Sequence, residues 1–301
     1  MPGGPRSVNK LVPSMEGIGR LPEVARRTLD RILDYQLEWS RYDGIFLEGH
    51  YTTKVEDNVF GGAPHPETRK EYEKGKAHEL EGKRAHMKAL HSSSALVVNA
   101  FDYWRRRNRI QDIANCCGTR CVVGGMEFEK THPIKGVGRT PPHLDVEFAG
   151  PTPLAIESKF TETYRRTTRR QLEKTKLDIY LEHEDIWGDM AKLRALARDI
   201  VQQSGATTEF EYLDVPQLIK HILGLKCSYG RAFSLLYLWY RVDSEEAAQH
   251  EQELANLRDR IDDGINFRTM TYQGLFGKIK RIPNVDPAYL EYLQQRYFSI
   301  D

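Results

Sequence analysis

Residues 143–160, HLDVEFAGPTPLAIESKF, alternate apolar and polar side chains on either side of a Gly-Pro-Thr-Pro turn. A period of two is the pattern of a half-buried strand, so the segment predicts a hairpin of strands 143–149 and 153–161. One face of this hairpin would be apolar and face a core. The apolar positions are Leu144, Val146, Phe148, Leu154 and Ile156, and the polar ones are Asp145, Glu147, Glu157 and Lys159.

The turn also sets which polar residues meet. A symmetric hairpin centred on residue 151 places Asp145 opposite Glu157 and His143 opposite Lys159, with Cβ atoms of opposed residues roughly 5 Å apart. Two opposed carboxylates repel unless a positive charge lies between them. Lys159 could supply that charge in a structural salt bridge. A divalent cation is the alternative, since Mg²⁺ prefers oxygen ligands and often takes one or two carboxylates plus phosphate oxygens.

Other segments predict an α/β domain. Continuous apolar character over 231–242 is typical of a central strand covered on both faces, and Asp214 with Pro216 predicts the start of a helix that Gly224 would end. We expect residues 1–20 to form a loose tail, and residues 21–301 a single domain with a core over about 75–275. The remaining expected helices are 21–40, 67–90, 91–107 (capped by Ser93 or Ser94), 171–203, 244–262 and 286–298, and the remaining expected strands are 119–129 and 267–272.

Charge is balanced over the chain but not along it. The net charge is only +1, so an anionic partner must be bound by a local patch rather than by the field of the whole protein. Residues 159–176 form such a patch, because they are rich in arginine and lysine. We expect this segment to bind a nucleic-acid backbone; a solvated helix face is the alternative. The arginines that carry this expectation are Arg165, Arg166, Arg169 and Arg170.

Cysteine and hydropathy patterns exclude other classes. The four cysteines, two of them adjacent, fit no common zinc or disulfide spacing and are expected to be reduced thiols. The longest apolar run, 233–240, is far too short to cross a bilayer. No secretory signal is visible at residues 1–10, so we expect no membrane partner and a cytoplasmic location.

Asp145, followed after eleven residues by Glu157-Ser158-Lys159, resembles the motif of the PD-(D/E)XK nuclease superfamily, which has the restriction-endonuclease-like fold. The predicted order of helix, three-strand meander, helix and further strand also resembles the core of that family over roughly residues 75–275. Gln217 in the later helix is similar to a glutamine of several nuclease branches, whereas His221 stands where some branches have tyrosine. Pro142 precedes Asp145 by three residues rather than one, so the Pro-Asp pair is absent.

The resemblance implies a central mixed sheet flanked by helices, and a Mg²⁺-dependent endodeoxyribonuclease active in defence or DNA processing. Outside the part that it covers, we expect extra N- and C-terminal helices. Asp145 and Glu157 would bind Mg²⁺, or Mn²⁺ in its place, and Lys159 would position or activate the attacking water. An acidic metal ligand from the first helix is common in the family. Candidates for that ligand are Glu79, Glu81 and Asn99, and further accessory candidates are His143, Glu162 and Gln217.

Several other functions remain open from the sequence. The substrate could be RNA, or the chain could be a non-catalytic nucleic-acid-binding module on the nuclease fold. Opposed carboxylates about 5 Å apart would also suit a retaining glycoside hydrolase, although the neighbouring lysine and the basic segment argue against sugars. A double-strand cut by a chain with one site would favour a homodimer.

Overall fold

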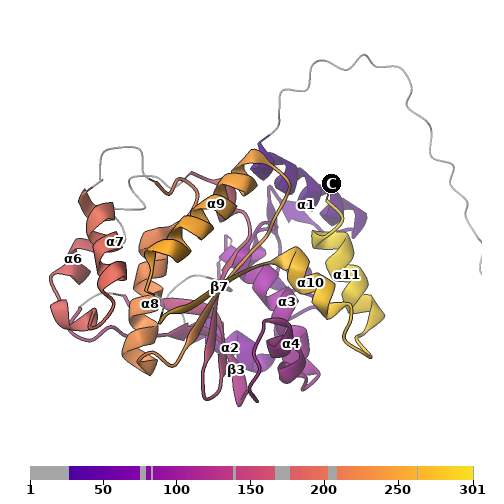
Figure 1. The fold of residues 1–301 in the computed structure, drawn as a ribbon. Helices are drawn as coiled ribbons and strands as arrows, with labels where there is room; N and C mark the ends of the chain where they lie inside the picture. Colours follow the sequence, from indigo (N-terminus) through magenta and orange to yellow (C-terminus); the bar gives the residue numbers. More distant parts are fainter. Residues whose placement is uncertain are drawn as a thin grey trace, which may run out of the picture.

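The computed structural model describes residues 27–74, 79–82, 84–137, 140–166, 177–202, 209–262 and 264–300. Its centre is a five-stranded sheet in the order β3-β4-β5-β6-β7, with helices on both faces (Figure 1). The predicted fold class, an α/β protein with a mixed central sheet flanked by helices, is confirmed. The strands are β3 (Gly125–Thr131), β4 (His143–Ala149), β5 (Leu154–Lys159), β6 (Ser234–Trp239) and β7 (Asn266–Thr271).

The predicted hairpin has the predicted register. Val146 pairs with Ile156 and Phe148 with Leu154 in the antiparallel β4–β5 ladder. Strand β6 then lies parallel to β5, and β7 lies parallel to β6. Every residue of β6 is buried, as its apolar run predicts. Strand β3 starts at Gly125, so the expected strand 119–129 begins six residues too early.

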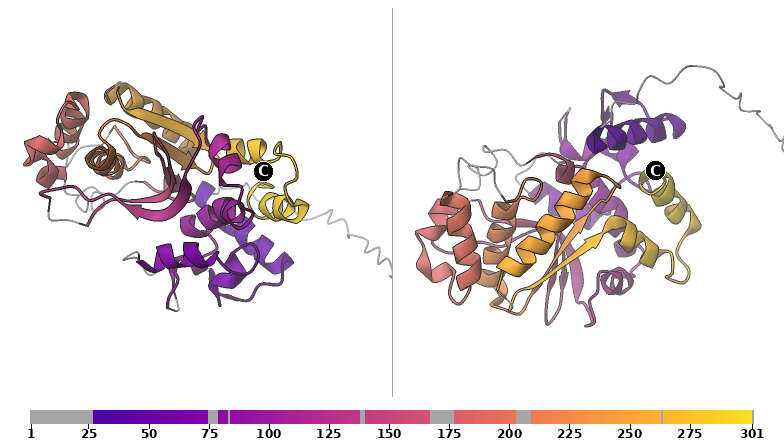
Figure 2. Two further views of the ribbon diagram at one scale, coloured as in Figure 1. Left: turned by 90° about the horizontal axis from the view of Figure 1, so that it is seen from below. Right: turned by 45° about the horizontal axis from the view of Figure 1, so that its top comes forward.

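One face of the sheet is covered by the helix that precedes the meander. This helix, α3 (Ser93–Arg106), packs Phe101 against Phe148 of β4, with 6.2 Å between ring centroids. Its N-cap is Ser92, whose Oγ accepts a hydrogen bond from the N–H of Ala95, so the expected cap at Ser93 or Ser94 is wrong. Helix α2 (Pro66–Lys74) lies on the same side of the sheet (Figure 2, left).

The opposite face is covered by α8 (Val215–Tyr229) and α9 (Glu245–Arg260), shown in orange on the other side of the sheet (Figure 2, left). Asp214 caps α8 and Pro216 lies in its first turn, as predicted. Gly224 does not end the helix. A Cβ there would lie 2.4 Å from Cγ of Pro142 and 2.9 Å from the carbonyl oxygen of His132, so glycine lets α8 approach the sheet closely. The helix ends at Gly230, which has φ of 62°.

The two ends of the described chain meet beside the sheet. Helix α1 (Thr28–Tyr42) lies next to α11 (Pro287–Tyr297), and the guanidinium of Arg296 stacks 4.2 Å from the ring centroid of Trp39 (Figures 1 and 2). Asp286 caps α11 and Pro287 begins it, as predicted.

The smaller elements include several that the sequence did not predict. Helices α4 (Ile110–Cys116) and α10 (Tyr272–Ile279) are absent from the predictions, and the expected helix 67–90 runs only through Lys74. The expected tail 1–20 lies outside the described residues. In the part of the chain that the structure describes, no helix is both long and apolar enough to span a membrane. The other elements are α6 (Leu177–Leu181), α7 (Ala191–Gln202), a short hairpin of β1 (Leu47–Glu48) and β2 (Tyr51–Thr52), and 3-10 turns η1 (Val55–Asn58), η2 (His86–Lys88), η3 (Glu162–Tyr164) and η4 (Glu184–Ile186).

Candidate active site

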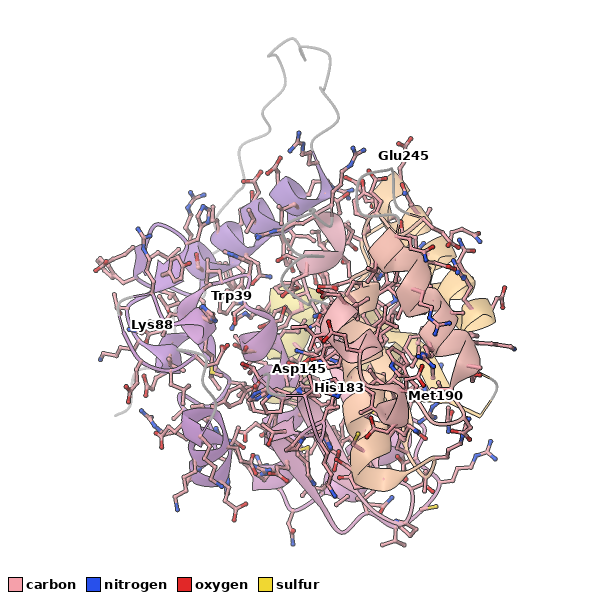
Figure 3. The ribbon with its side chains drawn as sticks, turned by 90° about the vertical axis from the view of Figure 1, so that its left-hand side faces the viewer. Trp39, Lys88, Asp145, His183, Met190 and Glu245 are labelled. Atoms are coloured by element: carbon pink, nitrogen blue, oxygen red, sulfur yellow. The ribbon has the colours of Figure 1, made fainter. Side chains whose placement is uncertain are left out.

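Three carboxyl side chains come from one level of three neighbouring strands. The β4–β5 register, extended by one residue, brings Asp145 opposite Glu157. The β3–β4 register on both sides of Glu129 likewise places Glu129 opposite Asp145. We call Glu129, Asp145 and Glu157 the carboxyl row. Figure 3 shows Asp145 between the N-terminal elements that carry Trp39 and Lys88 and the helices near Met190 and Glu245.

Lys159 pairs with the carboxyl row at the end of β5. Its Nζ lies 2.5 Å from Oε1 of Glu157 and donates a second hydrogen bond, 2.8 Å long, to Oε1 of Gln217. Burial acts to lower the pKa of Lys159, but Glu157 and then Glu162 outweigh it and raise that pKa above the ordinary value. Lys159 is therefore a fixed ammonium group.

The first two turns of α8 contact Lys159 and Glu157, through Gln217 and His221. Asp214 caps the helix by accepting a hydrogen bond from the N–H of Gln217, 3.0 Å away. His221 follows one turn later on the same side, and its Nδ1 lies 3.1 Å from Oε2 of Glu157. Burial acts to raise the pKa of Glu157, yet Lys159 and His221 hold that pKa at about 2. Glu157 is thus ionised between two nitrogen groups.

Asp145 lies in a different electrostatic setting from Glu157. Its Oδ2 accepts a 2.6 Å hydrogen bond from the backbone N–H of Ser158, just beyond the last paired residues of the hairpin. Burial, then the charges of Glu157 and Glu129, raise the pKa of Asp145 well above its ordinary value, against the opposing effects of Lys159 and this hydrogen bond. The repulsion expected between opposed carboxylates is present.

Glu129 is a site residue that the sequence did not reveal. It has φ of 52° inside β3, a left-handed conformation that costs about 1 kcal/mol for a residue with a side chain. Burial, then Glu79 and Glu157, raise its pKa to about 8. Strain of this kind in an otherwise regular strand often marks a functional position. The only local signal was its alternation with Glu127, which an exposed strand face would also show.

The three candidates for a first-helix ligand lie in different places. Glu79 is buried; its Oε1 lies 3.1 Å from Nδ1 of His86, and its Oε2 has no hydrogen-bond partner. Glu81 is exposed. Asn99 is buried, but its amide binds Phe60, Asn58 and Tyr297 and so joins α3 to η1 and α11. Glu79 is also the candidate that acts on the carboxyl row, because its charge raises the pKa of Glu129.

The remaining accessory candidates lie at the edge of the site. Nδ1 of His143 lies 3.8 Å from Oε2 of Glu129, on β3. The predicted pairing of His143 with Lys159 is not among the paired residues of the β4–β5 ladder. Glu162 accepts hydrogen bonds from Ser93 Oγ and from the N–H of Phe160, and so ties the end of β5 to the start of α3.

The arginines of the basic segment are described only in part. Arg165 and Arg166 are exposed just beyond β5, and Nε of Arg166 lies 2.8 Å from Oε1 of Glu211. Arg169 and Arg170 lie outside the described residues.

The donor set of this site fits a hard divalent cation. Within the described ranges, no three acidic, histidine or cysteine side chains converge into a ready-made metal cage. The carboxyl row nevertheless supplies oxygen donors of the type that Mg²⁺ prefers. Burial, and then the charges of other carboxylates, raise the pKa values of two members of the row, Glu129 and Asp145. Glu79 adds an unpartnered buried oxygen. Bound positive charge would relieve this repulsion.

A mixed sheet whose antiparallel meander gathers acidic residues and a lysine is consistent with a restriction-endonuclease-like fold. The comparison with family models agrees, since the model described as "Restriction Endonuclease associating with ARP" matches residues 29–298. The chain belongs to that family. No curated protein and no solved structure gave a match.

Proposed function

We propose that this protein is a metal-dependent endonuclease that hydrolyses phosphodiester bonds of DNA through a PD-(D/E)XK-type site. The observation that carries the proposal is the carboxyl row beside the Lys159 ammonium, in a chain that belongs to a restriction-endonuclease family. Neither feature alone would be sufficient, because charged strand faces are common and the fold also serves other roles.

Asp145 and Glu157 would hold Mg²⁺, or Mn²⁺ in its place. When bound, such an ion polarises a phosphoryl oxygen and lowers the pKa of coordinated water. Both oxygens of Glu157 already contact nitrogen groups, of Lys159 and of His221. A metal ion at Glu157 would compete with these contacts, and Gln217 would continue to hold Lys159 through its hydrogen bond.

Lys159 would act as a donor rather than as a base. Its raised pKa keeps the side chain protonated at neutral pH, so it can orient a water molecule and stabilise negative charge that develops on the phosphate. Gln217 accepts a hydrogen bond from the same ammonium group and restricts its position. Gln217 is thus a positioning residue in this proposal.

DNA would approach from the end of β5. Arg165 and Arg166 are exposed there, and Arg169 and Arg170 continue the basic segment. Contacts to phosphates from such residues are independent of sequence and weaken steeply with salt. RNA would meet the same charges, so the substrate class has to be measured.

A second candidate function is a nucleic-acid-binding module without catalysis. The observation in its favour is that both oxygens of Glu157 already contact nitrogen groups of the chain, on Lys159 and on His221. A site balanced in this way needs no metal. Cleavage that requires a divalent cation would separate the two functions.

The direct experiment incubates wild type, Asp145→Asn and Lys159→Met with supercoiled plasmid, linear duplex, single-stranded DNA and RNA. Each reaction contains Mg²⁺, Mn²⁺ or EDTA. We expect metal-dependent cutting of DNA by wild type and none by the variants. Linearised plasmid as an early product would favour a homodimer. Binding without cleavage on every substrate would contradict the proposal and support the non-catalytic binding module. Cleavage of RNA alone would identify RNA rather than DNA as the substrate.

A further inference from the structure

A second polar site lies at the other end of the sheet from Lys159. It is a surface pocket of about 620 Å³ beside the first residues of β5, β6 and β7 and the loop that follows α4. Leu154 of β5 lines it, and Glu157 is three residues further along the same strand, roughly 10 Å away. This pocket is therefore separate from the carboxyl row.

The pocket contains positive charge without acidic side chains. Arg120 and Arg268 line it, and no aspartate or glutamate is among the lining residues. Among the described residues, neither arginine forms an ion pair. Nη1 of Arg268 donates to the carbonyl oxygen of Gly118 at 3.1 Å, while its Nε is buried with no hydrogen-bond partner. An unsatisfied guanidinium nitrogen in such a place is costly.

The two arginines also repel each other. Burial lowers the pKa of Arg268; Cys117 opposes this effect, and the charge of Arg120 adds to it. A bound anion would remove this cost, because an opposite charge close by favours the charged form. Arginine is well suited to the purpose, since its planar group can bind phosphate oxygens with two parallel hydrogen bonds.

Neutral polar groups complete the lining. Asn115 and Thr119 lie on the loop side, and Asn266 and Ser234 lie on the strand side. Nδ2 of Asn266 donates to Oγ of Ser234 at 2.7 Å, which fixes both side chains. Amide and hydroxyl groups of this kind suit a sugar or a base next to a phosphate.

We propose that this pocket binds the phosphate of a small phosphorylated ligand, of about the size of a mononucleotide. The volume lies within the range of pockets for such ligands, roughly 300–1,000 Å³. The recessed position of Arg268 favours a free ligand over the backbone of a duplex, which is contacted mainly by exposed side chains. Arg268 and Arg120 hold the phosphate, and the amide and hydroxyl groups hold the rest.

Isothermal titration calorimetry of the full chain tests this with inorganic phosphate, adenosine 5′-monophosphate (AMP) and adenosine. We expect one molecule of phosphate or AMP per chain, with AMP the tighter, and no binding of adenosine. Arg120→Gln and Arg268→Gln should each weaken AMP binding by about tenfold or more. Arg41→Gln, which removes an exposed arginine in the last turn of α1, is the matched control and should bind AMP as wild type does.

Arg120 is exposed, so Arg120→Gln keeps the test decisive even where Arg268→Gln lowers stability. Absence of binding of both phosphate and AMP to wild type would overturn the proposal. Equal affinities in Arg120→Gln and Arg41→Gln would do the same. A duplex oligonucleotide that displaces AMP, and that binds Arg120→Gln more weakly than wild type, would assign the pocket to the nucleic-acid interface instead.

Discussion

Asp145 and Glu147 are two residues apart on β4 and therefore point to the same face of the sheet. Glu147 accepts a 2.6 Å hydrogen bond from the Tyr229 hydroxyl; Nζ of Lys130 lies 2.8 Å from its Oε1 and Nε2 of His132 lies 3.0 Å from its Oε2. We call these four residues the Glu147 cluster. Burial acts to raise the pKa of Glu147, but its hydrogen bonds with His132, Lys130 and Tyr229 outweigh burial and lower that pKa.

The pKa values of Asp145 and Glu147 shift in opposite directions because the two side chains have different partners. The carboxyl row has three acids for one lysine and two histidines, whereas the Glu147 cluster has one acid for a lysine, a histidine and a tyrosine. A fully partnered carboxylate stabilises a fold, and a carboxyl group short of cations is ready to bind one. We therefore assign a structural role to the Glu147 cluster and a functional one to the carboxyl row.

The largest expected effect is on DNA cleavage. Lys159→Met should lower the rate of Mg²⁺-dependent cleavage by about 100-fold or more, because it removes the donor proposed to stabilise charge on the phosphate. Plasmid cleavage over time measures this rate. Lys130→Met removes the matched lysine of the Glu147 cluster, and its folded fraction should cut at a rate close to that of wild type. Equal losses in both variants would contradict the division of roles.

The free energy of unfolding should depend more on the Glu147 cluster than on Asp145. Glu147→Gln should lower the free energy of unfolding by about 3 kcal/mol, since it removes the charge that partners Lys130 and His132 in a buried cluster. Asp145→Asn keeps an oxygen that can accept from the N–H of Ser158 and relieves repulsion, so it should be neutral or stabilise by about 1 kcal/mol. Urea unfolding measures both. A larger loss in Asp145→Asn would show that the carboxyl row is structural.

The pH dependence of stability should separate the two regions without metal. The pKa of Glu129 is raised to about 8 from 4.5, so between those values the folded chain binds more protons than the unfolded one. Stability therefore falls as pH rises through this window, by at most about 1.4 kcal/mol per pH unit. The lowered pKa of Glu147 acts oppositely, because its contribution is present above pH 4.5 and lost at lower pH.

Urea unfolding at pH 5.5, 6.5 and 7.5 in EDTA tests this, with Glu129→Gln as the comparison. The variant should lose the part of the decline that Glu129 contributes, while the raised pKa of Asp145 leaves a smaller decline. Added Mg²⁺ should flatten the decline in wild type. Groups away from Glu129 contribute equally to both proteins, so the difference reports on Glu129 and its neighbours Asp145 and His143. Identical slopes in the two proteins would contradict the raised pKa.

The smallest expected effects concern the exposed arginines. Arg165→Glu and Arg166→Glu should each weaken DNA binding about three- to tenfold and reduce the salt slope of the binding constant by about one. Stability should change little, because the Arg166–Glu211 ion pair is at the surface. Fluorescence anisotropy over a salt series measures the affinity, with Arg41→Glu as control. An unchanged slope would remove these arginines from the interface.

Local signals in the sequence were sufficient for the hairpin, the buried strand β6 and the starts of α8 and α11. Alternation sets which face of a strand is buried, and Asp214 with Pro216 is a signal carried by adjacent residues. The pairing of Asp145 with Glu157 followed from the turn alone, because a short turn fixes the register of its two strands. These features depend on neighbours in the chain.

Other parts of the site could not be read from neighbours. Nothing around Glu129 indicates its positive φ, and its raised pKa comes from Glu79 and Glu157, which are distant in sequence. Gly224 resembled a helix end, but it is required because Pro142 and His132 lie against it. His221 was noticed only as a departure from a motif, and its contact with Glu157 depends on how closely α8 docks.

The carboxyl row should bind a divalent cation, and the Glu147 cluster should not. Mn²⁺ binding, followed by electron paramagnetic resonance of the free ion, tests it most directly in wild type, Asp145→Asn and Glu147→Gln. We predict saturable binding by wild type and by folded Glu147→Gln, and at least about tenfold weaker binding by Asp145→Asn. No binding by wild type, or a loss in Glu147→Gln with none in Asp145→Asn, would contradict the claim.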